Sequence, residues 1–482
     1  MPSFLRSVRN MLRMKESVER GAVRVARIGV LNRALGTTVS VGLLWCGALA
    51  CSPSDSDSDS PKESETAQEA DPLAGHEFPP LEDSPDGRWR KARQIEGEID
   101  ALEGIGYASG YKEAPVERGV TINTAEAHTG YNFYVSGHGP EAVLMDMAGV
   151  ELHRWRASFD DVFPNFKRTL GTRLQYRDFW RRAYLYPNGD ILAIFEGHAL
   201  IKLDRNSEVL WTFTGLAHHD LEVTDDGRIY LLTRKGKVIP RINPDKAILE
   251  DFVVVLDSSG KRLEKISIYE SFENSKFEGL LKTVESRGDL FHTNTIEVLD
   301  GSLADRNPAF ARGNVLVSIL RMSTVVILDM NTKKVVWALS EGWKEQHQPT
   351  MLENGEMMVF DNLGGDERNG RTRVIQFDPI DYRETWSYEG DADNYFQSDR
   401  CGSCQRLPGG NTLITESDNG RAFEVTPDKR IVWEFLNPSL AGDDESLIAT
   451  LFEVVRLSPD FPVEWADGVV AASNSKSEST KQ

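Results

Sequence analysis

Residues 345–362 read Glu-Gln-His-Gln-Pro-Thr-Met-Leu-Glu-Asn-Gly-Glu-Met-Met-Val-Phe-Asp-Asn. The Asn-Gly pair at 354–355 is a strong hairpin signal, so the pattern predicts a short strand, a tight turn and a second strand over residues 357–360. Antiparallel strands joined by such a turn bring the head of the first strand beside the tail of the second. We therefore expect His347 to lie next to Asn362 at one edge of a sheet.

The same pattern recurs from about residue 119 onward, which indicates an internal repeat. Each block holds a first strand, a glycine turn, a second strand, a third strand that ends near Asp or Thr, and a fourth strand. The turns are Asn188-Gly189, Asp226-Gly227, Asp300-Gly301, Asn354-Gly355 and Gly409-Gly410, and the fourth strands carry Trp155, Trp211, Ile266, Trp337, Trp386 and Trp433. Six four-stranded antiparallel blocks of roughly 50 residues predict an all-β, six-bladed β-propeller over residues 116–468.

The ends of the repeat and its interruptions carry further expectations. Short strands at residues 132–134 and 454–465 lie at opposite ends of the repeat, and we expect them to close the ring by sharing a blade. Residues 235–250 and 269–290 do not follow the repeat, and the second segment has a helical pattern over residues 272–284. Insertions of this kind tend to lie on the functional face of a fold.

The N-terminal region has the pattern of an export signal. A basic segment runs into an uncharged stretch at residues 38–50, and Cys51 follows small residues. Cys51 resembles a bacterial lipoprotein acylation site, so residues 1–51 are interpreted as a signal and lipoprotein anchor. We expect a periplasmic or cell-envelope protein, attached to the membrane by a lipid at Cys51. The alternatives are an uncleaved anchor, for which the apolar run is short, and a cytoplasmic protein with a chance apolar run.

The remaining segments are polar or flank the repeat. Residues 52–82 are rich in Ser, Asp, Glu and Pro and predict a disordered acidic linker. Residues 83–115 predict a helical lead-in with one amphipathic stretch over 89–102, and residues 469–482 predict a disordered tail. The net charge of −20 argues against nucleic acid as a partner, because phosphate binding needs clustered Lys and Arg.

Two cysteines, Cys401 and Cys404, lie within the repeat as Cys-Gly-Ser-Cys. In an oxidising compartment this spacing is most simply a small-loop disulfide, and its formation would make a periplasmic thiol oxidase a partner. A redox-active pair would need a strand-to-helix context, whereas strands follow here. A zinc site would need a second pair of ligands.

Candidate site residues share a phase within the blocks. His219 and His347 each lie eight residues before the turn glycine of their block, at the start of a first strand. In the fourth block Asn294 lies at the phase of His219, and His292 lies two residues earlier, on the same side of the strand. First strands of a propeller run parallel around the axis, so these side chains should converge on one mouth of the central channel. Strand alternation predicts that His218 points the opposite way.

Second strands end at the same mouth, and two of them end in arginine. Arg234 is predicted to end the second strand of the third block, and Arg321 that of the fourth. The predicted site is therefore cationic, rich in imidazole and without a carboxylate cluster, which suits a phosphoryl-like or sulfuryl-like group. Two alternatives stay open: a water-filled channel lined by satisfied polar groups, and a three-histidine metal site against which Arg321 would lie.

Several motifs together resemble the bacterial arylsulfate sulfotransferases, the ASST family. They are Gln346-His-Gln-Pro-Thr with Phe360-Asp-Asn362, His292-Thr-Asn294, Val317-Ser-Ile-Leu-Arg-Met-Ser-Thr324, His218-His-Asp220, Gln405-Arg-Leu-Pro-Gly-Gly-Asn-Thr-Leu-Ile414 and Phe423-Glu-Val-Thr-Pro-Asp428. The resemblance implies an exported propeller, with no cofactor or metal, that moves a sulfuryl group from an aryl sulfate to a phenol without a nucleotide sulfate donor.

The resemblance also implies roles for individual residues. His347 matches the histidine that becomes transiently sulfated, and His292, Asn294 and Arg321 match groups that hold the sulfuryl oxygens. His219 matches a further pocket histidine, and the Cys401–Cys404 pair is the possible counterpart of a family disulfide.

From these roles we expect a ping-pong transfer through a sulfohistidine. Arg234 and Asn362 are added as substrate-binding residues because they share the predicted mouth. The competing functions are a non-catalytic propeller that binds a ligand or partner, a sulfate-ester hydrolase using the same site, and a quinone-cofactor dehydrogenase. The last would need more blades and an acidic calcium site.

Overall fold

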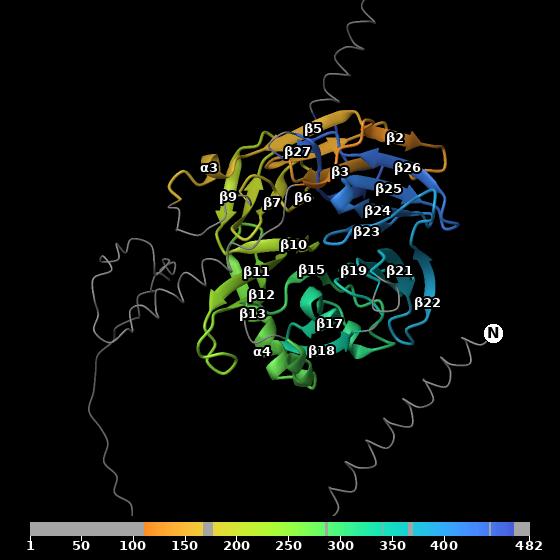
Figure 1. Cartoon of the computed structure of the whole chain (residues 1–482). Helices are drawn as coiled ribbons and strands as arrows, with labels where there is room; N and C mark the ends of the chain where they lie inside the picture. The colour runs from red at the N-terminus through yellow and green to blue at the C-terminus, as the bar shows by residue number, and fades with distance from the viewer. Residues whose placement is uncertain are drawn as a thin grey trace, which may run out of the picture. The chain divides into compact units, whose positions relative to one another are not determined.

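The computed structural model describes residues 110–166, 177–284, 288–340, 342–364, 370–442 and 445–466. Within these ranges the chain is all-β, with mostly antiparallel sheets and few, short helices. This confirms the all-β, antiparallel part of the expected fold class, and Figure 1 shows the propeller-like succession of the sheets around a common centre.

Six sheets of four or five strands make up most of the described chain, and we number them I to VI in chain order of their fourth strands. Sheet I holds β29 (Leu451–Leu457), β3 (Tyr131–Ser136), β4 (Glu141–Met145) and β5 (Glu151–Arg156). Sheet II holds β6 (Arg182–Leu185), β7 (Ile191–Phe195), β8 (Ala199–Leu203) and β9 (Val209–Phe213). Sheet III holds β10 (Ala217–Val223), β11 (Ile229–Lys237), β12 (Ile248–Leu256) and β13 (Arg262–Ser267), with β14 (Gly288–Asp289) parallel to β12.

The other three sheets follow the same meander. Sheet IV holds β15 (Thr293–Val298), β16 (Val315–Ile319), β17 (Thr324–Asp329) and β18 (Lys334–Leu339). Sheet V holds β19 (His347–Met351), β20 (Met357–Asp361), β21 (Arg373–Phe377) and β22 (Glu384–Tyr388). Sheet VI holds β23 (Ser403–Arg406), β24 (Thr412–Glu416), β25 (Arg421–Val425) and β26 (Ile431–Leu436), and β2 (Gly119–Asn123) pairs with β26.

Successive sheets are joined by apolar cores. Six buried clusters in the described residues each lie between two neighbouring sheets, and one of them joins sheet VI back to sheet I. The fourth-strand tryptophans add hydrogen bonds between sheets. The indole nitrogen of Trp155 donates to Gly189 O (2.9 Å), and that of Trp433 donates to Met147 O (3.0 Å). The repeated Trp thus fastens one sheet to a turn of the next, because a buried indole N–H needs an acceptor.

The two ends of the repeat meet in sheet I. β29 pairs antiparallel with β3, so a C-terminal strand supplies the first strand and the N-terminal part of the repeat supplies the other three. This confirms the expected closure by a shared blade. The lead-in differs from its prediction at its end, because β1 (Gly110–Glu113) is a strand paired with β28 (Leu447–Ala449), which in turn pairs with β27 (Leu440–Ala441).

The segments outside the repeat are partly regular. The predicted insertion at 235–250 is shorter than expected, because β11 and β12 run on into it and pair through Lys237 and Ile248. The second insertion contains α4 (Ile268–Glu273) and η2 (Glu278–Thr283). The remaining short helices are α3 (Phe159–Val162), η3 (Pro308–Phe310), η4 (Leu320–Met322) and η6 (Ser417–Asn419).

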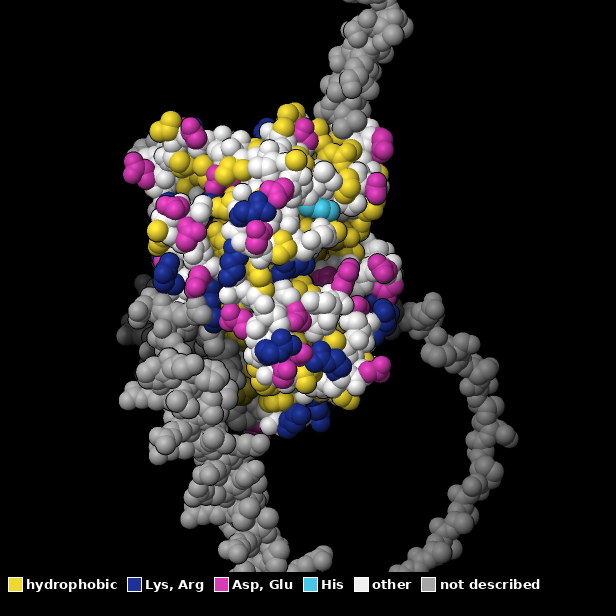
Figure 2. All heavy atoms as spheres, turned by 90° about the vertical axis from the view of Figure 1, so that its right-hand side faces the viewer, with side chains coloured by type: hydrophobic (Ala, Val, Ile, Leu, Met, Phe, Trp, Pro, Cys, Tyr) yellow, Lys and Arg dark blue, Asp and Glu magenta, His cyan; other side chains and the backbone are white. Residues whose placement is uncertain are grey.

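Several sequence predictions lie outside the described residues. These are the signal and lipoprotein anchor with Cys51, the acidic linker, the amphipathic stretch at 89–102 and the C-terminal tail. Among the helices that are described, not one is both long and apolar enough to cross a membrane. Figure 2 shows Lys and Arg interspersed with Asp and Glu over one face of the molecule, not gathered by sign.

Candidate active site

The first strands of sheets III, IV and V begin with an irregularity in their pairing. The register shifts between Ala217 and Leu221, between Thr293 and Thr295, and between His347 and Thr350. His219 and Gln348, within two of these shifts, and His292, directly before the third, adopt positive φ values of 54°, 46° and 51°. Such bulges re-aim side chains and are common beside active sites, where the strained backbone is held by its surroundings. The histidines of the site therefore owe their directions to bulges, not to regular strand alternation.

His347 lies at the head of β19, as predicted, and its side chain is buried. Its Nδ1 lies 2.8 Å from Asn362 Oδ1, at the end of β20, and 3.2 Å from Glu345 O. Its Nε2 is buried without a hydrogen-bond partner. Burial lowers the pKa of His347 to about 3, and the charges of Arg181 and His292 add to this, whereas the hydrogen bond that Nδ1 donates to Asn362 acts in the opposite direction. The imidazole is therefore neutral over the whole physiological range.

Asn362 decides which nitrogen of His347 carries the proton. Its Nδ2 donates to Ser398 O (2.7 Å) and to Cys401 O (2.9 Å), so its Oδ1 must be the atom that faces the imidazole. An amide oxygen only accepts, so Nδ1 of His347 is the N–H donor. The lone pair then resides on Nε2, which is the arrangement needed for a neutral nitrogen nucleophile.

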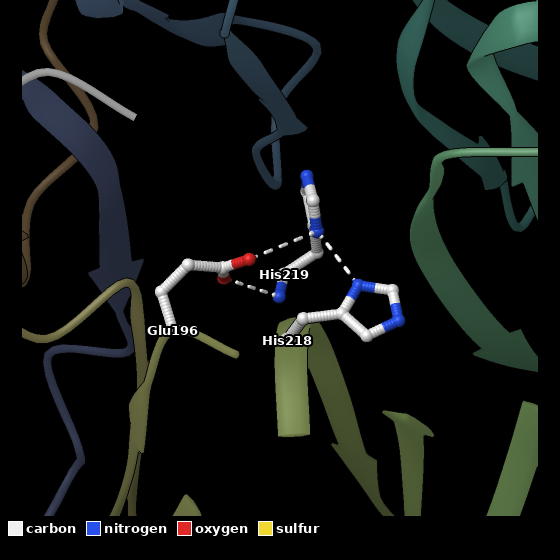
Figure 3. Close-up of side chains that lie close together, drawn as sticks. All are labelled: Glu196, His218 and His219. Carbon is white, nitrogen blue, oxygen red and sulfur yellow. Dashed lines mark hydrogen bonds and ion pairs between the residues drawn. The ribbon is translucent and has the colours of Figure 1, made fainter. Parts of the chain in front are cut away.

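His218 and His219 form a buried pair with Glu196, which follows β7 (Figure 3). The two Nδ1 atoms lie 2.8 Å apart, and Glu196 Oε2 accepts from the backbone N–H of His219 at 2.9 Å. The prediction that His218 points away from His219 is wrong, because the bulge and the left-handed backbone of His219 break the alternation. Burial and nearby positive charges lower the pKa of both imidazoles well below the usual value.

Glu196, His218 and His219 also offer ligand atoms of the types that a metal ion prefers. The arrangement does not suit a cation. The Glu196 carboxylate already lies 3.7 Å from the guanidinium of Arg234, and the two Nδ1 atoms are directed at each other. Arg234 lies within β11, not at its end as predicted, because that strand continues to Lys237.

His292 lies immediately before β15 and contacts both His219 and Asp289. Its ring packs against that of His219 with centroids 5.0 Å apart. Its Nδ1 lies 2.5 Å from Asp289 Oδ2, and its backbone N–H donates to the other oxygen of the same carboxylate at 3.1 Å. Asn294 donates from Nδ2 to Gln346 O at 2.8 Å, so its amide fixes the chain directly before His347.

A small pocket joins these elements. Its lining comprises Arg181, Arg182, His219, Asp220, Asn294, Thr295, His347, Gln348, Gly402 and Phe452, which surround about 240 Å³ of space including the open mouth. Arg181 is buried, and its guanidinium lies over the ring of Phe452 at 4.9 Å. The sequence analysis did not select Arg181, although it lies eight residues before Gly189, in the phase shared by His219 and His347. Applying the same count to every block would have found it.

Arg321 is exposed to solvent, whereas the predicted histidines His219 and His347 are buried. The second strand of sheet IV ends at Ile319, not at Arg321 as predicted, and Arg321 lies in η4 with an exposed side chain. It is nonetheless close enough to Asp289 for its charge to lower the pKa of that carboxyl. The structure thus connects Arg321 to the site through Asp289 and His292, whereas Arg181 is the buried cation of the pocket itself.

The expectation of a site without a carboxylate cluster is wrong. Three buried carboxylates lie behind the imidazoles, namely Glu196, Asp251 and Asp289. Asp251 accepts from the backbone N–H and the hydroxyl of Thr293 at 2.9 and 3.0 Å. These residues follow second strands or lie in inserted and third strands, so the first-strand phase that selected the histidines could not select them.

The structure also differs from the predicted disulfide. Cys401 and Cys404 are free, buried thiols. Cys404 belongs to the apolar cluster between sheets V and VI, whereas Cys401 Sγ lies 4.0 Å from a guanidinium nitrogen of Arg181. Gly402 between them lies so close to Phe360 that an added Cβ would fall 2.2 Å from the ring. The two side chains therefore serve different environments, and the geometry gives no reason to expect a thiol oxidase as partner.

Comparison with known proteins gives one family and several distant likenesses. A family model described as arylsulfotransferase (ASST) matches residues 182–438. The uronate isomerase of Oceanobacillus iheyensis is 28% identical over 165 residues, which cover 31% of this chain and 32% of that protein, so the chain spans about a third of the curated relative.

Among solved structures, a protein of unknown function from Bacteroides caccae has a TM-score of 0.44 at 11% identity, covering 68% of this chain and 98% of that one. The Cps50 (Swd1) β-propeller domain of Myceliophteria thermophila has a TM-score of 0.40 at 11% identity, covering 69% and 99%.

Proposed function

Because this chain belongs to the arylsulfotransferase (ASST) family, we propose that it moves a sulfuryl group from an aryl sulfate ester to a phenolic acceptor through a sulfohistidine at His347. An arylsulfotransferase-type function follows from the family. The observation that supports the finer proposal is the buried Nε2 of His347, which has no hydrogen-bond partner. Asn362 holds the proton of the imidazole on the other nitrogen, Nδ1.

In the first half-reaction, Nε2 of His347 attacks the sulfur of the bound aryl sulfate. The N–S bond forms while the S–O bond to the aryl group breaks, and the phenol oxygen leaves with the electron pair and takes a proton from His292. Arg181 and His219 line the pocket where charge develops on the sulfuryl oxygens. Asn294 is proposed to act through the backbone of Gln346, which it holds.

In the second half-reaction, an acceptor phenol attacks the same sulfur and gives its proton to His292, and the N–S electron pair returns to Nε2. Asn362 keeps the Nδ1 proton in place throughout, so the sulfated ring stays positively charged and remains a good leaving group. A neutral amide suits this task because, unlike a carboxylate, it does not draw the proton away.

We further propose that the six sheets form a six-bladed β-propeller and that the protein is exported and lipid-anchored at Cys51. Arg234 and Arg321 are proposed to offset the negative charges of Glu196 and Asp289, which lie behind the imidazoles, so that the site as a whole stays positive. These assignments rest on the six inter-sheet cores and on the N-terminal sequence pattern.

The test is covalent labelling by a chromogenic aryl sulfate, followed by the mass of the intact protein. With 4-nitrophenyl sulfate alone we expect one SO₃ adduct per chain and one equivalent of released nitrophenol, and added phenol should discharge the adduct as phenyl sulfate. His347→Asn should lose both the adduct and turnover, whereas His128→Asn, a histidine outside the pocket, should retain them. An adduct on His347→Asn would disprove the assignment. Discharge by water at the same rate as by phenol would make the protein a sulfatase.

A further inference from the structure

His219 lines the same pocket as His347, and the ring of His292 packs against that of His219, but the surroundings of these two imidazoles differ. His219 meets another imidazole at 2.8 Å, and its distance to Glu196 Oε1 is 3.6 Å. His292 instead meets a carboxylate directly, at 2.5 Å through Nδ1. Only a group that is stabilised in its protonated form can supply a proton near neutral pH, so these two histidines are not equivalent as acids.

Asp289 holds the whole of His292, not its ring alone. One carboxylate oxygen binds the imidazole Nδ1, and the other accepts the backbone N–H of the same residue. This closes a small ring that fixes the left-handed backbone of His292, with φ of 51°, and turns Nε2 away from the carboxylate. Asp289 itself is anchored by β14, which pairs with Ile248 and Leu249 at the inner end of β12.

The electrostatic surroundings keep Asp289 ionised. Its burial favours the neutral acid, but the charges of His292, Arg234 and Arg321 and the bond to His292 outweigh this and lower its pKa to about 2. The neighbouring Asp251 is the opposite case, because burial and the charge of Asp289 raise its pKa to about 7. One negative charge therefore lies next to Nδ1 of the His292 ring.

We propose that Asp289 is a positioning residue that makes His292 the proton donor to the departing phenol, and thereby determines which aryl sulfates the enzyme can use. This inference rests on the proposed sulfuryl transfer. A phenol with a low pKa leaves without a proton, whereas a phenol with a high pKa needs one as the S–O bond breaks. The pair of Asp289 and His292, the dyad, is thus required for sulfate esters of phenols with a high pKa. It is dispensable for sulfate esters of phenols with a low pKa.

The test is the leaving-group dependence of the first half-reaction at one fixed pH. The release of phenol from 4-nitrophenyl, phenyl and 4-methylphenyl sulfate is measured in single turnovers. For Asp289→Asn we expect less than about a 3-fold loss with the nitrophenyl ester and about a 100-fold loss with the methylphenyl ester, the size of general acid catalysis. His292→Asn should behave in the same way. The double variant should be no slower than the slower single variant, because both changes remove one function.

Asp251→Asn is the matched control. This carboxylate is buried beside Asp289, and it accepts from the backbone N–H and the hydroxyl of Thr293. We expect it to slow all three esters by the same factor, if at all, and to lower the thermal unfolding temperature. A merely structural role for Asp289 would give the same uniform loss, and that result would overturn the inference.

The outcome for each variant separates the two proposals. If the wild-type protein forms no adduct with any of the esters, the proposed function itself fails. If the wild type reacts but the three esters respond equally to His292→Asn, only the inference about the dyad fails. Should Asp289→Asn not fold, the series with His292→Asn alone decides, because it leaves the carboxylate in place.

Discussion

His347 begins β19 and His292 lies directly before β15, so both stand at the heads of neighbouring first strands, yet their polar partners differ. Nδ1 of His347 binds the neutral amide of Asn362, whereas Nδ1 of His292 binds the carboxylate of Asp289. Burial then keeps His347 unprotonated, with a pKa of about 3, and leaves Nε2 as a nucleophile. Under the proposed function, one residue type supplies both the nucleophile and the acid, because the group bound at Nδ1 decides what Nε2 of the same imidazole can do.

Changing Asn362 to Asp should break this distinction. A carboxylate at 362 would stabilise the protonated form of His347, so fewer molecules would carry a free Nε2 near neutral pH. We expect sulfo-enzyme formation to fall about 100-fold at pH 7, comparable to the loss of one preorganised donor. The measurement is the single-turnover rate as a function of pH.

A control separates charge from lost hydrogen bonds. Asn362→Ala also removes the bonds to Ser398 and Cys401, but it introduces no charge. The rate of Asn362→Asp should recover as pH rises and His347 loses its proton, whereas that of Asn362→Ala should stay low and flat. Identical pH profiles for the two variants would contradict the role given to the amide.

Arg181 tests the same comparison through substrate binding instead of proton transfer. Its guanidinium lines the pocket and its charge acts on both His347 and His219. Arg181→Lys keeps the charge but loses the planar fork that binds two oxygens, so we expect about a 10-fold lower kcat/KM. The loss should be the same for all aryl sulfates, unlike that of Asp289→Asn.

Arg182→Lys is the comparison at the neighbouring position. Arg182 also lines the pocket, but its guanidinium pairs with the carboxylates of Asp220 and Glu453. This variant should lower the thermal unfolding temperature while the leaving-group dependence stays unchanged. A larger kcat/KM effect at 182 than at 181 would show that Arg182, not Arg181, holds the sulfuryl oxygens.

Glu297 extends the comparison from histidines to carboxylates. Like Asp289 it is buried, but it accepts the backbone N–H of Met351 at 3.0 Å and has acidic neighbours. Burial, with the charges of Glu222 and Asp300, raises its pKa to about 8 from 4.5. The folded state therefore holds this proton more tightly than the unfolded state, and the resulting stability is present below pH 4.5 and lost as pH rises through 8.

Glu297→Gln keeps an acceptor oxygen and removes the ionisation. We expect its unfolding temperature to match that of the wild type at pH 4.5 and to exceed it by about 2 °C or more at pH 9. Scanning calorimetry at the two pH values measures this difference. An equal shift at both pH values would show that Glu297 acts by packing, not by ionisation.

The repeat could be predicted from the sequence because its signals are local. Glycine turns, alternating strands and a Trp in nearly every fourth strand each depend on neighbouring residues, and the phase before the turn glycine located His219 and His347. The same phase contained Arg181 and Gly402, which line the pocket but were not selected. The directions of His218 and of Cys401 could not be predicted, because a bulge or a close approach to Phe360 overrides strand alternation.

By itself the sequence determined the repeated four-stranded pattern, the pairing of its two terminal strands, and the placing of His219 and His347 at one pocket, since these follow from spacing along the chain. Only the tertiary structure decided the proton states. Asn362, Glu196 and Asp289 reach their histidines from a second strand, from a neighbouring sheet and from an insertion outside the repeat. A pKa depends on burial and on charges brought together by folding, so spacing alone could not tell the nucleophile from the acid.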